Sequence, residues 1–170
     1  MNPLLKESSH RFKTVEFNNI KLGDFMPAIH ESIEIARKNI VNIKSNSETP
    51  TFSNTIVALE TSQEDLSRAV SVYFHLFSSE STPEFQALAN EISPILANFG
   101  NDITLDDELF EKIEYVYENE YENLEFEDKR LTEITYKSFV RNGAKLDRNE
   151  KDRLRKVDEE LSSLSPKFSN

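Results

Sequence analysis

Apolar residues recur at steps of three and four along most of this chain, which is typical of amphipathic helices. The first stripe consists of Met26, Ile29, Ile33, Ala36, Ile40 and Ile43. This spacing places the side chains on one face of an α-helix. Only 3 glycines occur in 170 residues, whereas sandwiches and barrels need many Gly-rich turns. We therefore predict an all-α fold, an antiparallel helical bundle of about five or six helices.

Capping and turn residues set the expected limits of these helices. Thr82–Pro83 and Asp147 with Glu150 are typical helix starts, and Asn142–Gly143 is a typical helix end. The first expected helix runs from Asp24 to about Ser45, and the second runs from Thr51–Asn54 to about Ser79. The third begins at Thr82, and the fourth runs from Thr104–Asp107 to about Asn119. The fifth covers roughly Asp128–Arg141, and the sixth begins at Asp147. In the second of these helices, Gln63 is a polar interruption of the apolar stripe.

The chain divides into an arm, residues 1–22, and a helical domain, residues 23–170. The arm shows no sustained periodicity, and we expect it to dock on the helices through four apolar side chains: Phe12, Val15, Phe17 and Ile20. The last stripe of the domain consists of Leu154, Val157, Leu161, Leu164 and Phe168. Its apolar pattern continues to within two residues of the chain end. We interpret the chain as a piece of a longer protein, truncated within its last helix. Such a piece is expected to leave this strip exposed, whereas a free-standing protein buries it.

Charge and composition limit the kinds of binding partner and the location that we expect for this chain. The formal net charge is −11, with the acid concentrated between Glu108 and Glu133, which argues against a nucleic-acid partner. The basic stretch at residues 148–156 is interleaved with acids, as on a solvated helix face. The absence of cysteine excludes disulfides and thiolate zinc sites. No apolar run approaches the ~20 residues of a membrane span, so we expect no membrane partner and a cytoplasmic location, or a periplasmic one if a leader was removed.

One short motif bears on metal chemistry. The run His30-Glu31-Ser32-Ile33-Glu34 begins like H-E-x-x-H, in which two histidines one helical turn apart bind zinc. Its fifth position is Glu34 rather than histidine. His30 and Glu34 fall beside the buried face that Ile29 and Ile33 mark. We interpret them as an ordinary surface pair and predict no metal ligand there.

The remaining candidates favour packing over chemistry. His75, between two apolar residues, is interpreted as a histidine at the edge of the core with a local hydrogen bond, and His10 lies in the arm with no visible partner. Four aromatic residues lie among glutamates: Tyr115, Tyr117, Tyr121 and Phe126. We predict that they pack against the core and its edge, and the alternative is that they face a peptide ligand. No Gly-rich phosphate loop or G-x-S-x-G motif occurs. We predict no catalytic, cofactor-binding or metal-binding residue in this chain.

Residues 50–60 carry a family resemblance. Their sequence, Pro-Thr-Phe-Ser-Asn-Thr-Ile-Val-Ala-Leu-Glu, resembles the P-T-F-x-N-T-I-x-A-L-E signature near the N-terminus of the thimet oligopeptidase and neurolysin family of zinc metallopeptidases. The bacterial peptidyl-dipeptidase (dipeptidyl carboxypeptidase) branch is the most similar. Further segments resemble that branch in the same order: residues 2–5, 24–28, 91–94, 109–110, 139–144, 159–164 and 167–168.

The resemblance implies a neurolysin-like N-terminal domain without catalytic residues. In the family, the zinc ligands lie far C-terminal to the matched region, and the N-terminal helices form one wall of a channel that admits short peptides. The resemblance therefore implies zinc in the parent but no cofactor in this chain, which alone should be inactive. Its partners would be the missing catalytic portion of its own chain and short peptides. The alternative is a free-standing acidic helical module that binds another protein and has no enzymatic role.

Overall fold

The computed structural model describes residues 2–6, 8–80 and 82–168, with side chains to residue 164. The helices are α1 (Leu22–Ser45), α2 (Ala58–Thr61), α3 (Glu64–Ser79), α4 (Pro83–Thr104), α5 (Asp107–Asn119), α6 (Phe126–Arg141) and α7 (Arg148–Phe168). Short 3-10 turns at Phe17–Asn19 and Tyr121–Asn123 and a π-helical segment at Phe52–Val57 complete the helical elements. No strand occurs in these residues, and the predicted all-α fold is confirmed. None of the described helices combines the length and hydropathy that a membrane span requires.

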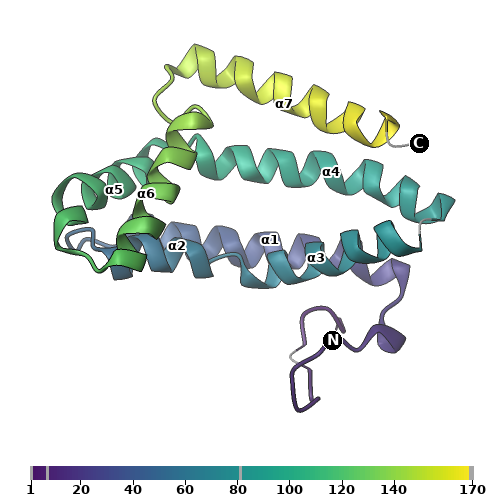
Figure 1. Cartoon of the computed structure of the whole chain (residues 1–170). Helices are drawn as coiled ribbons and strands as arrows, with labels where there is room; N and C mark the ends of the chain where they lie inside the picture. The colour runs from purple at the N-terminus through teal and green to yellow at the C-terminus, as the bar shows by residue number, and fades with distance from the viewer. Residues whose placement is uncertain (1, 7, 81, 169–170) are drawn as a thin grey trace.

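The helices are arranged in layers (Figure 1). α1 pairs with α2 and α3 in one layer, and α4 lies between this layer and α7. α5 and α6 pack together and close one end of the bundle. The N-terminal arm lies on the side of the α1–α3 layer that faces away from α7.

The core between α1, α3 and α4 is built from the predicted apolar stripes. The stripe of α1 is buried at Ile29, Ile33, Ala36, Ile40 and Ile43, with Met26 partly buried beside it. At the other end of the layer, the Tyr73 ring lies 5.2 Å from that of Phe25, and the Tyr73 hydroxyl donates to the Phe85 carbonyl oxygen at 2.6 Å. Burial raises the pKa of Tyr73 to about 12. The phenol therefore remains a neutral hydrogen-bond donor inside the core.

The second predicted helix is not continuous. Thr51 caps it as expected, since its hydroxyl accepts from the Asn54 N–H at 3.1 Å while the Asn54 side chain accepts from the Thr51 N–H at 2.7 Å. The next turns are π-helical, and the helix breaks at Ser62–Gln63 before α3 begins. The Ser62 hydroxyl donates to the Leu59 carbonyl and the Ser62 carbonyl accepts from Asn39 of α1. These side-chain hydrogen bonds compete with the helical ladder, so the expectation of one helix to Ser79 is wrong.

Two predicted helix starts are shifted. Asp24 is the third residue of α1 rather than its N-cap, and its carboxylate accepts from the Lys21 N–H at 2.8 Å. Thr104 still belongs to α4, whereas Asp106 caps α5 by accepting from the Leu109 N–H at 2.9 Å. In both cases an aspartate satisfies an orphan backbone donor at the helix start. The starts predicted at Thr82 and Asp147 are confirmed by their capping bonds.

The arm docks differently from the expectation. Phe12 is 78% exposed and Phe17 is 45% exposed, so neither anchors the arm. Val15 and Ile20 are partly buried against the core, as predicted. The main anchor is Leu4, which is buried at 3% exposure.

The last helix is held to the bundle by charged groups. Lys151 is buried and donates to the Leu105 carbonyl at 3.3 Å as well as pairing with Asp107. Arg155 pairs with Asp102 of α4 at 2.8 Å. The predicted apolar strip is only partly buried. Leu154 lies beside Gly143 and is half-buried, whereas Val157, Leu161 and Leu164 are 50%, 55% and 45% exposed. The Phe168 side chain lies outside the described residues.

Two glycines provide a matched test of backbone strain. Gly143, which ends α6, has φ +94°, and an added Cβ would lie 2.7 Å from Leu154 Cδ2. We expect Gly143→Ala to lower the free energy of unfolding by about 1–2 kcal/mol, since the left-handed conformation alone costs that much for an L-residue. Gly100 lies inside α4 with open space around it, so Gly100→Ala should raise stability by about 0.5–1 kcal/mol. Urea unfolding measures both, and equal effects of the two substitutions would contradict the assigned helix end.

Candidate functional site

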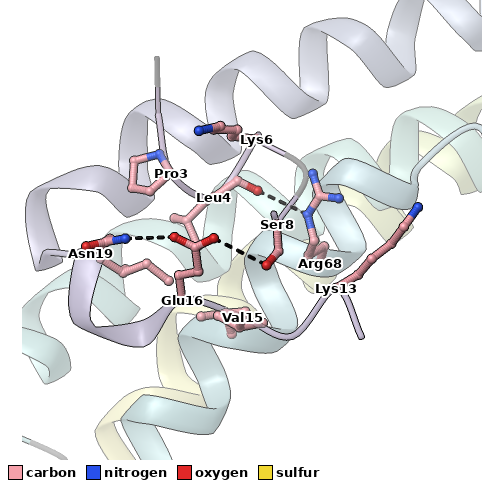
Figure 2. Close-up of a pocket in the computed structure, with 11 residues that line it drawn as sticks. Pro3, Leu4, Lys6, Ser8, Lys13, Val15, Glu16, Asn19 and Arg68 are labelled. Atoms are coloured by element: carbon pink, nitrogen blue, oxygen red, sulfur yellow. Dashed lines mark hydrogen bonds between the residues drawn. The ribbon is translucent and has the colours of Figure 1, made fainter. Parts of the chain in front are cut away.

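A pocket of about 270 Å³ lies between the N-terminal arm and α3 (Figure 2). It combines apolar side chains with four charged ones. The described lining residues are Pro3, Leu4, Lys6, Ser8, Lys13, Val15, Glu16, Asn19, Ile20, Arg68 and Val72. Only Arg68 and Val72 come from a helix of the bundle, so the arm makes most of the wall.

The first wall of the pocket is fixed by hydrogen bonds at the start of the arm. The Asn2 side chain donates to the Asp24 carbonyl at 2.7 Å and accepts from the Leu4 N–H at 3.0 Å. The Leu4 carbonyl then accepts from Arg68 Nε at 3.1 Å. With the Leu4 side chain buried, these bonds attach the arm to both α1 and α3.

Glu16 holds the second wall. Its carboxylate accepts from the Asn19 amide at 2.8 Å, from the Ser8 hydroxyl at 3.3 Å and from the Ser9 N–H at 3.4 Å. The Asn19 bond, followed by the Ser9 bond, lowers the pKa of Glu16 below the ordinary glutamate value. Glu16 is therefore an ionised carboxylate near neutral pH, and it closes the loop between Ser8 and Asn19.

The loop between these two walls contains a strained residue. Lys13 has φ +51°, and its N–H donates to the His10 carbonyl at 2.9 Å in a tight turn. A left-handed conformation costs roughly 1–2 kcal/mol for a residue with a Cβ. The turn brings Lys13 to the rim of the pocket.

Basic side chains outnumber acidic ones in the described lining of the pocket. Among the described lining residues, Lys6, Lys13 and Arg68 are positively charged and Glu16 is negatively charged. Arg68 is also paired with Asp65 at 2.8 Å. No histidine is among the described lining residues, and the Ser8 hydroxyl donates to a carboxylate that is a weak base. A hydroxyl nucleophile needs a base of suitable pKa within hydrogen-bond reach. The described lining offers no such pair.

The motif His30-Glu31 lies outside this pocket. His30, Glu31 and Glu34 are all exposed on α1. Glu34 lies 3.9 Å from Arg37 Nε one turn along the helix, so its charged neighbour is an arginine rather than His30. Within the described residues, no group of three or more His, Cys, Asp or Glu side chains is placed to hold a metal ion.

The other two histidines have partners that the sequence did not indicate. His75 is exposed, not at the core edge, and its ring lies 6.0 Å from the Phe17 ring of the arm. His10 Nδ1 lies 3.2 Å from the Thr14 hydroxyl, and Nε2 lies 3.9 Å from the Glu16 carboxylate. The Phe17–His75 contact lies between the arm and α3, whereas the His10 contacts lie within the arm.

The aromatic group near the acidic region divides between packing and exposure. Tyr117 stacks on Tyr136 of α6 with centroids 4.1 Å apart, and Tyr121 lies 5.3 Å from Tyr117. These contacts agree with the packing interpretation. Tyr115 is 40% exposed and Phe126 is 75% exposed, so these two do not pack as expected.

Sequence reasoning missed the pocket because the arm has no periodicity to interpret. Its lining residues are spread over residues 3–20 and joined by Arg68 and Val72 from a distant helix. The one local signal was a glutamate, Glu16, close in sequence to Ser8, Ser9 and Asn19. Short polar side chains around a carboxylate favour a closed loop.

Comparison with known proteins shows that the chain is similar to peptidases along its whole length. It is 35% identical over 170 residues to dipeptidyl carboxypeptidase of Escherichia coli (strain K12). The aligned region covers 99% of this chain and 25% of that protein. Dipeptidyl carboxypeptidase of Salmonella typhimurium is 33% identical over 169 residues, again 25% of its length. Organellar oligopeptidase A of Arabidopsis thaliana is 24% identical over 169 residues, 21% of its length.

The predicted resemblance to the dipeptidyl carboxypeptidase branch is thereby confirmed. The chain spans about a quarter of the length of these relatives. No family model matches the chain.

The lowered pKa of Glu16 predicts how the arm responds to acid. Because the folded pKa lies below the unfolded one, the carboxylate stabilises the docked arm above the ordinary glutamate pKa of about 4.3. This contribution is lost as pH falls through the lowered value. An NMR titration of the Glu16 side-chain carboxyl should therefore show a midpoint below that ordinary value. Asn19→Ala should raise the midpoint, since the Asn19 bond is the largest cause of the shift.

Ser8→Ala serves as the matched control for this titration, because the Ser8 bond is the smallest of the contributions that lower the pKa. Its effect on the midpoint should be smaller than that of Asn19→Ala. A wild-type midpoint at or above the ordinary value would show that the loop is not closed by Glu16.

Proposed function

We propose that this chain is the N-terminal, non-catalytic helical region of a zinc metallopeptidase of the dipeptidyl carboxypeptidase type. One observation carries the proposal: identity of 33–35% extends over 99% of the chain but over only a quarter of each bacterial relative. The remaining three quarters of such a protein would contain the catalytic portion. In this chain the position that would complete H-E-x-x-H after His30 holds Glu34.

In the longer protein, the described helices would act as scaffold. We propose that the α1–α4 layers form one wall of a channel that admits short peptides with a free C-terminus. The catalytic portion would hold the zinc, whose chemistry would be to activate water for hydrolysis of a peptide bond, and the longer protein would release a dipeptide. This chain would contribute shape and substrate selection and would bind no zinc itself.

The exposed strip on α7 supports a partner within the same polypeptide. Val157, Leu161 and Leu164 are each about half exposed, on a face separate from the one that Lys151 and Arg155 turn toward α4. Burying an aliphatic side chain fully is worth about 1.5–3 kcal/mol, so about half of that remains to be gained at each position. We propose that the catalytic portion covers this strip.

The first test is to read the gene past Asn170 and to express the longer protein. We expect H-E-x-x-H several hundred residues on, and release of dipeptides from the C-terminus of short peptides. A chelator should abolish this activity and added zinc should restore it. The 170-residue chain alone should release none and should show no stoichiometric zinc binding by calorimetry. A stop codon after Asn170, or activity indifferent to chelation, would contradict the proposal and favour a free-standing interaction module.

The second test uses the absence of cysteine to measure the exposure of the α7 strip. A Leu161→Cys variant should react readily with a thiol reagent in the 170-residue chain, because Leu161 is 55% exposed. In the longer protein, with its other cysteines replaced, the same thiol should react at least about 10-fold more slowly, since reaction then requires local opening.

Ile113→Cys is the matched control, because Ile113 is fully buried in α5 and its thiol should be protected in both proteins. Equal reactivity of the Leu161→Cys thiol in the two proteins would show that the catalytic portion does not cover the strip.

A further inference from the structure

The pocket between the arm and α3 presents opposite charges above an apolar floor. Glu16 lies on one side and Arg68 on another, with Ser8 between them, while Pro3 and Leu4 lie across from Val15 (Figure 2). Ile20 and Val72 complete the apolar surface. A small ligand that carries both charges and an apolar side chain would be complementary to such a site.

Arg68 has the capacity to bind a carboxylate. A guanidinium has five N–H donors, of which Nε is used by the Leu4 carbonyl and one Nη2 hydrogen by Asp65 at 2.8 Å. The hydrogens of Nη1 are engaged in neither bond. These two contacts also hold the guanidinium in place, so little side-chain entropy is lost on binding. Lys6, which also lines the pocket, adds positive potential toward an incoming carboxylate.

Glu16 has the capacity to accept an ammonium group. Its Oε2 makes one short bond, to Asn19, whereas every contact of Oε1 is long. The Ser8 hydroxyl and the Ser9 hydroxyl donate to Oε1 at 3.3 Å, the Ser9 N–H donates at 3.4 Å, and His10 Nε2 lies 3.9 Å away. Long contacts of neutral donors are weak, so a charged donor would be a better partner for Oε1. The carboxylate is held in position by the same loop that forms the wall.

The volume restricts the size of the ligand. About 270 Å³ is the space of roughly nine water molecules at about 30 Å³ each. This exceeds what an ion needs and lies just below the lower end, about 300 Å³, of pockets for drug-sized molecules. A ligand of one or two amino acids fits these limits.

We propose that this pocket binds a dipeptide, with its α-carboxylate on Arg68, its ammonium group on Glu16 and an apolar side chain against Leu4 and Val72. The choice of a dipeptide over a single amino acid rests on the proposed function, whose product is a dipeptide. Occupancy would tie the arm to α3, because Glu16 belongs to the arm and Arg68 to the helix. The product of the enzyme would thus stabilise the docked arm.

Calorimetry with the 170-residue chain and L-alanyl-L-leucine tests this site. We expect 1:1 binding, weakened about 10-fold or more when the amino group is acetylated or the carboxylate is converted to an amide, since each change removes a charge-assisted hydrogen bond. No binding at about 10 mM, which corresponds to less than roughly 3 kcal/mol, would overturn the proposal. Equal binding of the free and blocked dipeptides would overturn it as well.

Two variants locate the binding site. Arg68→Gln should abolish binding, and Lys6→Gln should weaken it a few-fold, because Lys6 also lines the pocket and its charge attracts the carboxylate. Arg153→Gln removes an exposed arginine on α7 and should leave affinity unchanged. If Arg68→Gln also loosens the arm, the comparison of free and blocked dipeptides on the wild-type chain still tests whether both charges of the ligand are bound. Absence of dipeptide binding would leave the peptidase activity of the longer protein untouched, so the two proposals fail separately.

Discussion

The carboxylate of Asp102 joins three helices from three layers, and the position of α7 depends on it. One oxygen accepts from Arg37 of α1 at 2.7 Å and the other from Arg155 of α7 at 2.8 Å. Partly exposed ion pairs contribute at most about 1 kcal/mol each, whereas the buried stripes of α1 and α3 contribute far more through apolar contact. The Asp102 pair therefore contributes only a small part of the stability, and this part weakens with salt.

The same arrangement explains why the strip on α7 is uncovered. Residues of an α-helix advance by about 100° each, so Leu161 and Val157 lie about 80–160° around the helix from Lys151 and Arg155. A helix that turned its apolar face toward α4 would withdraw Arg155 from Asp102 and Lys151 from the Leu105 carbonyl. Leaving that lysine buried without its partners would be costly. The polar contacts thus fix the rotation of α7 and leave the apolar side chains of Val157, Leu161 and Leu164 exposed.

Periodicity predicted the parts of the fold that depend on local physics. The stripe of α1, the caps at Thr51 and Thr82 and the stop at Gly143 follow from one segment at a time, and the structure contains them. The break at Ser62–Gln63 could not be predicted, because it depends on Asn39 from another helix reaching the Ser62 carbonyl. The pocket depends in the same way on Arg68 reaching Leu4, 64 residues away in the chain. Features made by long-range polar contacts leave no period in the sequence.

The two surfaces that carry the proposals lie on opposite sides of the molecule. The arm and its pocket lie on the outer side of the α1–α3 layer, whereas α7 lies beyond α4 on the other side (Figure 1). The core between them is continuous from Phe25 and Tyr73 to Phe99 of α4, and Arg37 lies over the Phe99 ring, 5.3 Å from its centroid. Because Arg37 also binds Asp102, the α1 layer that docks the arm is directly connected to the ion pair that positions α7.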